Sequence, residues 1–232
     1  MSEELWALEQ LARARRLQDW MFAELRPSAP GPMLEVGAGI GTFSRLLLAA
    51  GAAPLVLLEP EPACVEALER AFSNDERVEI APELLREAPS LRSRAGFFRY
   101  ALAQNVLEHI EDDSAAVAAI VDSLAPGGEL AVLMPAHPRL YGRLDRQFGH
   151  VRRYTSRRLR QLLADAGAEL VSLRNFNLLG VPGWFVSGRT GRVGISDGTL
   201  AVYESLLRAW RPLEDAFHPP FGLSLVARAQ KP

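Results

Sequence analysis

Three glycines at alternate positions, Gly37, Gly39 and Gly41, follow a short apolar run that contains one carboxylate, Glu35. Glycine permits a positive φ and lets a ligand lie directly against the backbone. A dinucleotide-binding turn has the form G-x-G-x-x-G, but Thr42 stands where its third glycine belongs. A carboxylate two residues before the first glycine would repel a pyrophosphate and attract a positively charged ligand. The spacing therefore favours a cationic ligand over a dinucleotide.

This E-x-G-x-G-x-G form resembles the first motif of class I methyltransferases that use S-adenosylmethionine (SAM). SAM carries an ammonium and a sulfonium group, so its charge agrees with the carboxylate. The resemblance implies that SAM is bound at Glu35, Gly37, Ala38, Gly39 and Gly41. A tight turn that binds no ligand is the alternative.

Acidic residues follow the second and third expected strands. Glu59, with Pro60 after it, stands about 20 residues past the glycine turn, where a carboxylate accepts hydrogen bonds from ribose hydroxyls. A solvated strand end is the alternative for Glu59. After the third strand, the resemblance implies an acidic contact to adenine. Pro82 comes first there and Glu83 follows it, so we take both as candidates.

The string N-V-L-E-H-I-E-D-D at 105–113 follows the fourth expected strand. It closely resembles a motif of a bacterial methyltransferase group of type 11/12. By that resemblance Asn105 and Val106 line the sulfonium and methionine part of SAM, with His109 nearby. The acidic side chains of this string are expected to form a solvated helix start, where they suit the helix dipole: Glu108, Glu111 and Asp112.

The segment 135–155 concentrates side chains that could act on a substrate. It leaves the carboxyl end of a central parallel strand, where open α/β sheets bind ligands. Its P-A-x-x-x-L-Y-G-x-x-D and G-H-x-R-R-Y strings are similar to those of the same bacterial group, in which this loop faces the methyl acceptor. We expect contacts to the acceptor from His137, Arg152, Arg153 and, in a later insertion, Trp184.

His150, Tyr141 and Tyr154 are the candidate catalytic residues of this loop. His150 would act as a general base on a hydroxyl or amine that accepts the methyl group. Positioning of the acceptor and a structural contact within the loop are its alternatives. The tyrosines would orient the substrate or close around the sulfonium, with packing as the alternative.

The two arginines of this loop, Arg152 and Arg153, allow two interpretations. They would bind a carboxylate or phosphate bidentately, or one of them would form a salt bridge to Asp145. His137, Asp145 and His150 have side chains that bind metals, but their spacing matches no ligand pattern, so no metal site is predicted.

Strands and helices alternate from 33 to 173, which predicts a doubly wound parallel α/β sheet. The resemblance adds a final antiparallel strand and implies a Rossmann-like, seven-stranded sheet of order 3-2-1-4-5-7-6 with helices on both faces. One domain is expected over 1–232. Its parts are an N-terminal helical cap, the core, an insertion that could act as a lid, and the last strand, at 1–30, 33–173, 175–215 and 220–229.

Helical periodicity predicts an amphipathic helix over 3–26, which packs on the domain or closes over the cofactor. A second helix is predicted over 200–210, with five residues on its apolar face: Leu200, Tyr203, Leu206, Leu207 and Trp210. It would pack on the domain, roof the acceptor pocket or make a dimer contact, so a monomer or a homodimer is expected. The arginine-rich stretch 83–95 is expected to be a solvated surface helix.

Composition limits the partners of this chain of 232 residues. The formal net charge of −2 gives no basic excess for nucleic acid. Cys64 is the single cysteine, which excludes an intrachain disulfide. No apolar run is long enough for a membrane span, and the N-terminus lacks the apolar core of a signal peptide. We therefore expect a cytoplasmic protein that acts on a small molecule.

The sequence thus predicts an enzyme that transfers the methyl group of SAM to an oxygen, nitrogen or carbon atom of a small molecule, with S-adenosylhomocysteine (SAH) as the product. Natural-product metabolism is one setting in which the bacterial group acts. The alternative is a protein of the same fold that binds SAM or SAH without methylating, for which Arg99 and Pro82 are departures from the family pattern. Thr42 disfavours a nicotinamide-dependent dehydrogenase.

Overall fold

The computed structural model describes residues 8–9, 12–190 and 197–232. One sheet runs through this part of the chain, with strand order β3-β2-β1-β4-β5-β7-β6. The pairs among β1 to β5 are parallel, and β7 is antiparallel to both of its neighbours. The predicted order and the antiparallel last strand are confirmed. The strands are β1 Gly31–Val36, β2 Ala52–Leu58, β3 Val78–Ala81, β4 Phe98–Gln104, β5 Leu124–Pro135, β6 Glu169–Phe176 and β7 Ser224–Gln230.

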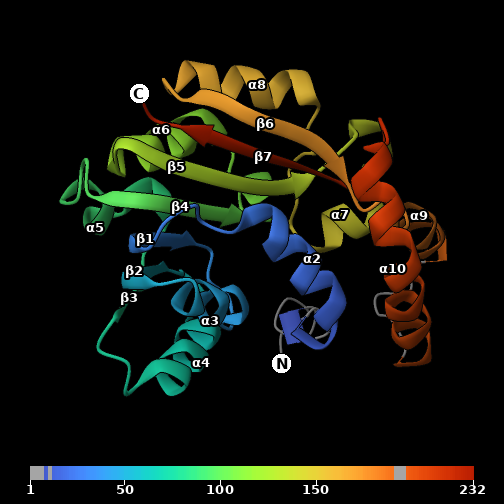
Figure 1. Cartoon of the computed structure of the whole chain (residues 1–232), viewed down its shortest axis with the longest axis horizontal. Helices are drawn as coiled ribbons and strands as arrows, with labels where there is room; N and C mark the ends of the chain where they lie inside the picture. The colour runs from blue at the N-terminus through green and yellow to red at the C-terminus, as the bar shows by residue number, and fades with distance from the viewer. Residues whose placement is uncertain (1–7, 10–11, 191–196) are drawn as a thin grey trace.

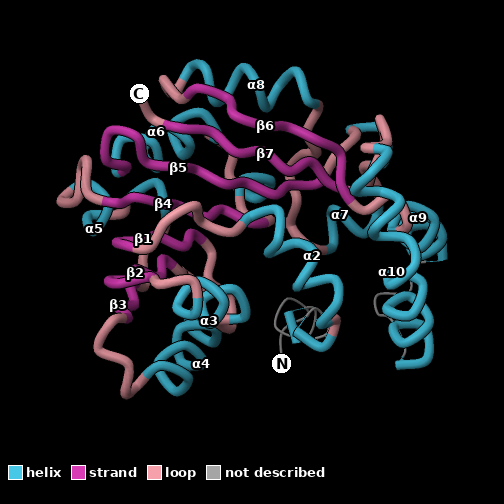
Figure 2. The backbone as a smooth tube through the Cα atoms, in the orientation of Figure 1, coloured by secondary structure: helices cyan, strands magenta, loops and turns pink. Residues whose placement is uncertain are grey.

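Helices cover both faces of the sheet, which forms the middle layer of the molecule (Figure 2). The α-helices are α2 Arg15–Leu25, α3 Thr42–Ala49, α4 Pro62–Phe72, α5 Pro89–Arg92, α6 Asp113–Ser123, α7 Arg143–Gln147, α8 Ser156–Asp165, α9 Gly180–Thr190 and α10 Asp197–Phe217. Three 3-10 turns join them: η1 Leu85–Glu87, η2 Leu107–His109 and η3 Pro138–Leu140.

Two apolar cores lie on the two faces of the sheet. One contains side chains of α5, α6 and α8, and the other contains side chains of α2, α3, α4 and α10. The central strands serve both cores at once, because successive side chains of a strand point to opposite faces. The run Leu55–Leu58 is buried throughout. A continuous apolar run of this kind is typical of a parallel strand that is covered on both faces.

The predicted helix over 3–26 is interrupted at the non-helical Ala14, after which α2 begins at Arg15. Residues 8–9 and 12–13 are also helical, and the rest of the predicted range before Ala14 lies outside the described residues. The stretch 83–95 also differs from its prediction. It forms two short helical turns whose Leu85 and Leu91 are buried. In α10, Leu200 and Leu207 are buried as expected, but Leu206 is 52% exposed.

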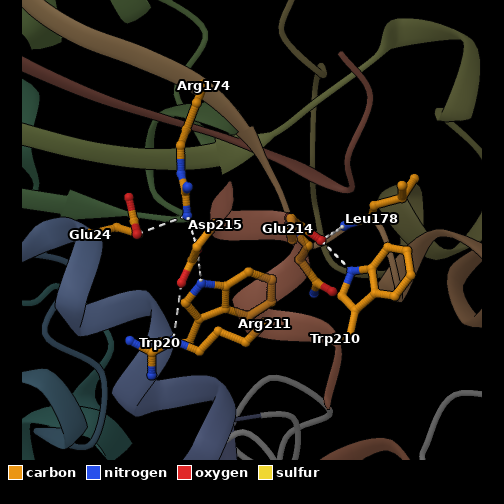
Figure 3. A network of polar contacts seen from close by, with 9 residues as sticks. Trp20, Glu24, Arg174, Leu178, Trp210, Arg211, Glu214 and Asp215 are labelled. Atoms are coloured by element: carbon orange, nitrogen blue, oxygen red, sulfur yellow. Dashed lines mark hydrogen bonds and ion pairs between the residues drawn. The ribbon is translucent and has the colours of Figure 1, made fainter. Parts of the chain in front are cut away.

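Helix α10 lies against α2 and the end of β6 through a partly buried polar network (Figure 3). Asp215 accepts hydrogen bonds from Trp20 Nε1 and from Arg174, and Arg174 also pairs with Glu24 at 2.8 Å. Glu214 accepts hydrogen bonds from the backbone N–H groups of Asn177 and Leu178 and from Trp210 Nε1. The insertion therefore holds the N-terminal helix onto the sheet.

Among the residues that the model describes, each helix is too short or too polar to cross a lipid bilayer.

Candidate active site

The carboxyl ends of β1, β4 and β5 point to one end of the molecule, where α2, α7, α9 and α10 gather (Figure 1). The glycine turn, the 105–113 string and the loop 135–155 leave the sheet at this edge. Ligands of open α/β sheets bind at such an edge. The topology therefore brings three separate candidate segments of the sequence to one place.

The three glycines of the turn adopt positive φ values, +70° at Gly37, +55° at Gly39 and +80° at Gly41. A side chain at Gly37 would overlap Val106, and one at Gly41 would lie 2.6 Å from Phe72. Gly39 instead faces Leu8, whose side chain would be 3.2 Å from an added Cβ atom. Internal packing thus requires glycine at positions 37 and 41, and Gly39 lies beneath the side chain of Leu8.

Glu59 connects the end of β2 to the glycine turn. Its Oε2 accepts a hydrogen bond from the N–H of Gly39 at 2.8 Å, and its Oε1 accepts from the N–H of Glu61 at 3.0 Å. The side chain is buried. A carboxylate that is held on this turn places negative charge beside the backbone that a ligand would approach.

Glu35 belongs to β1 and lies directly before the glycine turn, and its predicted contact to the cofactor stays a prediction. It is buried, and its Oε2 accepts a hydrogen bond from Ser44 Oγ at 2.6 Å. Burial, and then the nearby charge of Glu59, raises the pKa of Glu35 to about 8, although the Ser44 hydrogen bond opposes this shift. Glu35 is therefore largely protonated near neutral pH, and the attraction for a cation that its sequence position suggested falls to Glu59.

The two candidates after β3 are Pro82 and Glu83, and both are at least partly exposed to solvent. Pro82 is exposed, and so is Pro60 after β2. Glu83 accepts hydrogen bonds through Oε2 from the hydroxyl and the N–H of Ser90, at 2.6 and 3.2 Å. Glu83 thereby anchors α5, and its predicted contact to adenine stays a prediction.

Asn105 and Val106 lie directly beside the glycine turn. Asn105 has a φ of +51°, and its N–H bonds to the carbonyl of Leu133 at 2.8 Å. Asparagine tolerates this left-handed conformation better than most residues. Val106 packs on Gly37. The left-handed conformation of Asn105 therefore turns the chain after β4, so that Val106 packs against the glycine turn after β1.

Glu108 is the main correction to the sequence analysis. The expected solvated helix start holds for Asp112, which accepts from the N–H of Ala115 at 2.9 Å. Glu108, in contrast, has a side chain with 0% exposure. Its pKa is raised to about 8, chiefly by burial. The 3-10 turn η2 points this carboxyl inward, whereas a full helical turn was expected to point it to solvent.

His109 and His150 meet at this point, with ring centroids 4.9 Å apart in an edge-to-face arrangement. Burial lowers the pKa of His109 to about 4, and the neighbouring His150 adds to this effect. His150 Nδ1 lies 3.0 Å from Asp145 Oδ1, which leaves Nε2 on the side of Glu108, 4.0 Å from its Oε1. His150 is thus held in one orientation by a buried carboxylate.

Asp145 is the anchor of the loop. Arg153 Nε donates to its Oδ1 at 2.6 Å, and the N–H of Gly142 donates to its Oδ2 at 2.8 Å. The salt bridge considered for one arginine is therefore confirmed for Arg153. The guanidinium of Arg153 also lies 4.7 Å from the ring centroid of Trp184. The insertion 175–215 therefore contacts the loop 135–155.

The remaining loop candidates have contacts within the protein. Tyr141 donates its hydroxyl to the carbonyl of His150 at 2.8 Å. Tyr154 is fully buried and donates to the carbonyl of Leu107 at 2.9 Å. Arg152 pairs with Asp113 at 2.8 Å and also donates to the carbonyl of Glu111. These contacts hold the loop against η2 and α6.

His137 lies apart from the histidine pair. Its ring stacks on Phe221 with the centroids 3.9 Å apart, and Gly222 N–H donates to its Nε2 at 3.5 Å. Among the described residues, neither His137 nor Asp145 belongs to a group of three or more metal-binding side chains whose ligand atoms lie close together.

The sequence matches a methyltransferase domain over residues 8–173. The chain belongs to the methyltransferase domain family. This match spans the glycine turn, the 105–113 string and the loop 135–155, so the geometry above is that of a methyltransferase domain. A comparison of the sequence with curated proteins finds no match.

Solved structures share this methyltransferase fold at low sequence identity. A geranyl diphosphate methyltransferase in complex with SAM has a TM-score of 0.68 and 14% identity, over 99% of this chain and 90% of that one. The N-methyltransferase NodS from Bradyrhizobium japonicum WM9, in complex with SAH, has a TM-score of 0.60 and 18% identity, over 95% and 87%. The [4+2]-cyclase SpnF has a TM-score of 0.63 and 18% identity, over 94% and 80%.

The sequence analysis did not single out one further polar group at this edge of the sheet. Gln104, the last residue of β4, has a buried Oε1 without a hydrogen-bond partner among the residues described. Buried polar atoms are ordinarily paired, so this oxygen calls for a ligand or water. Its position at the end of a central strand is the signal by which it could have been found.

Proposed function

We propose that this methyltransferase domain binds SAM at the glycine turn and transfers its methyl group to a small-molecule acceptor, with SAH as the product. The observation that supports this most directly is the hydrogen bond between Glu59 and Gly39, which puts a buried carboxylate on the backbone of the glycine turn. A cationic ligand with ribose hydroxyls suits both features.

The residues at this edge fit SAM by their chemistry. The turn at Gly37, Ala38 and Gly39 would hold the ligand against backbone, with Glu59 as the partner of its hydroxyls. Gln104, at the same edge, offers a buried oxygen that has no hydrogen-bond partner in the described part of the chain. When bound, SAM supplies an electrophilic methyl group on a positively charged sulfur. Orienting the acceptor and excluding water are then the main tasks left to the protein.

The acceptor side is proposed to be the loop 135–155 with Trp184 above it. His150 is the proposed catalytic residue, because Asp145 fixes its ring and leaves Nε2 available to take a proton. Tyr141 positions His150 through its backbone carbonyl. The observed partners of Tyr154, Arg152 and Arg153 support a positioning role for them instead of contact with the acceptor.

The N-terminal segment is proposed to act as a lid. Leu8 lies over Gly39, and the segment that carries it leads into α2, which α10 holds in place. A cover of this kind would exclude water from the reacting atoms.

Calorimetric titration of the purified chain with SAM, SAH and NAD tests the cofactor. We expect saturable binding of SAM and SAH and none of NAD. SAH formation is then measured with a panel of hydroxyl, amine and activated-carbon acceptors. An absence of heat with both SAM and SAH would contradict the proposal.

The second candidate is a protein that binds SAM or SAH on this fold and does not methylate. The similarity to the [4+2]-cyclase SpnF supports this candidate, because the name of that protein indicates a reaction other than methyl transfer on the same fold. Arg99 does not support this candidate. It lies in the amino-terminal part of β4, against Gly31, at the opposite end of the sheet from the site. Tight SAM binding without SAH formation on any acceptor would support this candidate.

A further inference from the structure

Glu108, His109 and His150 form a compact group on the acceptor side of the site. The first two belong to η2, directly after β4, and the third belongs to the loop before α8. Their ligand atoms all lie within 4.8 Å of one another. The loop and η2 are joined at this point, because the N–H of Val151 bonds to the carbonyl of Glu108 at 2.8 Å.

The Glu108 carboxyl lacks a partner that would justify its burial. Its side chain is 0% exposed, and within the described residues neither oxygen receives a hydrogen bond from another residue. The guanidinium of Arg153 is nearby but donates to Asp145 and to the carbonyl of Ala136. Because a buried carboxylate without a partner is unfavourable, this group calls for a cation or a proton.

Both imidazole rings are anchored by a hydrogen bond, and for His150 the anchored nitrogen is the one that does not face Glu108. His150 Nδ1 bonds to Asp145, which Arg153 and Gly142 in turn hold in place. A hydrogen bond joins the ring of His109 to the backbone of Gly149. Metal-binding histidines have their second nitrogen held by a carboxylate or a carbonyl in this way.

We infer that Glu108, His109 and His150 bind one divalent transition-metal cation. Two imidazoles and one carboxylate suit Zn²⁺, Mn²⁺, Fe²⁺ or Co²⁺, whereas Mg²⁺ and Ca²⁺ prefer oxygen ligands. Ligand atoms at about 2.1 Å from one ion lie at most about 4.2 Å apart, so ligand atoms that are 4.8 Å apart have to approach one another by at least about 0.6 Å.

Three protein ligands leave at least one coordination position for another molecule. This step rests on the proposed function: an acceptor with an oxygen donor, such as a phenol or a hydroxy acid, would fill that position. With the ion bound, the lone pair of His150 Nε2 would be used in coordination, so this nitrogen would not take the acceptor proton. Coordination to the ion would acidify the bound hydroxyl, and its proton would pass to water.

Titration of the metal-stripped full chain with Zn²⁺, Mn²⁺ and Mg²⁺ by calorimetry tests the site, with Co²⁺ absorption as a second readout. We expect one ion per chain and binding of Zn²⁺ and Mn²⁺ at least tenfold tighter than that of Mg²⁺. Glu108→Gln and His109→Asn should each weaken binding more than tenfold. If Glu108→Gln fails to fold, His109→Asn carries the test.

Glu111→Gln and His218→Asn are the matched controls, since they remove a carboxylate and an imidazole outside the group. Both should bind the ion as the unchanged chain does. The inference is overturned if the unchanged chain binds none of these transition metals, or if the variants of the group bind as tightly as the controls. A SAM titration of the metal-free chain separates this result from a failure of the proposed function.

Discussion

The side chain of Glu59 both holds the shape of the glycine turn and gives it negative charge. Its two oxygens bond to the backbone at Gly39 and Glu61. A ribose hydroxyl bound there would add to, or replace, these contacts. Substitution of Glu59 is therefore the most direct test of the proposed SAM binding at the glycine turn.

Glu59→Gln should weaken SAM binding by about 1–3 kcal/mol, because hydrogen bonds to a charged group contribute about that much. The affinity is measured by calorimetry, with Glu61→Gln as the control, since that exposed carboxylate lies at the start of α4. Unchanged affinity in Glu59→Gln would contradict the ribose role.

In the metal-free chain, His150→Ala should lower turnover by about 10²- to 10⁴-fold with little change in SAM affinity, since general bases contribute that much. The assay compares the rate of SAH formation with the calorimetric affinity for SAM in the same preparation. His218→Ala provides the control. Full turnover in His150→Ala would remove this residue from the chemistry.

Elements of the fold bring these residues together through contacts between distant segments. Helix α10 carries Glu204, whose carboxylate accepts hydrogen bonds from the N–H groups of Arg16 and Leu17 at 2.8 and 3.1 Å. An acidic group at a helix N-terminus compensates the helix dipole and the unpaired N–H groups. The cap of α2 thus comes from another helix, since Ala14 has no side-chain acceptor.

Glu204→Gln should reduce the free energy of unfolding by about 1 kcal/mol, the usual loss for a helix N-cap. Urea denaturation measures it. Glu76→Gln, an exposed carboxylate, is the control and should change stability by less than about 0.5 kcal/mol. Equal stability of the two variants would mean that α10 does not cap α2.

At the scale of the whole molecule, the sheet buries ionisable groups along with its apolar core. Glu35 is the clearest case: burial raises its pKa from 4.5 to about 8. Between these values the folded chain holds a proton that the unfolded chain releases. The stabilisation is complete below the lower value and is lost as the pH rises through the higher one.

Glu35→Gln should therefore weaken the pH dependence of stability. In the unchanged chain this group lowers the free energy of unfolding by up to about 1.4 kcal/mol per pH unit as the pH rises. Urea denaturation at about pH 6, 7 and 8 measures the slope for each chain. Glu108, with its pKa also raised to about 8, contributes equally to both chains and cancels in the difference. Parallel slopes for the two chains would show that Glu35 is not protonated in the fold.

The local sequence determined the parts that depend on neighbours in the chain. The glycine turn, the acid at the end of β2 and the alternation of strands and helices are visible because turns, strand ends and apolar runs are short-range features. The strand order came from the resemblance to methyltransferases and is confirmed. The pairing of Arg153 with Asp145 was among the alternatives because their charges are opposite and close in sequence.

Only the tertiary structure decided which charged groups are buried. Glu108 was expected in solvent, yet the loop 135–155 folds over it and pairs its own backbone with that of η2. Tyr154 likewise becomes a buried anchor through the carbonyl of Leu107. Such contacts join segments about forty residues apart, as for Tyr154 and Leu107, which are 47 apart. Periodicity reports which face of an element is apolar, but not which distant segment covers it, so the meeting of Glu108, His109 and His150 emerged only from the fold.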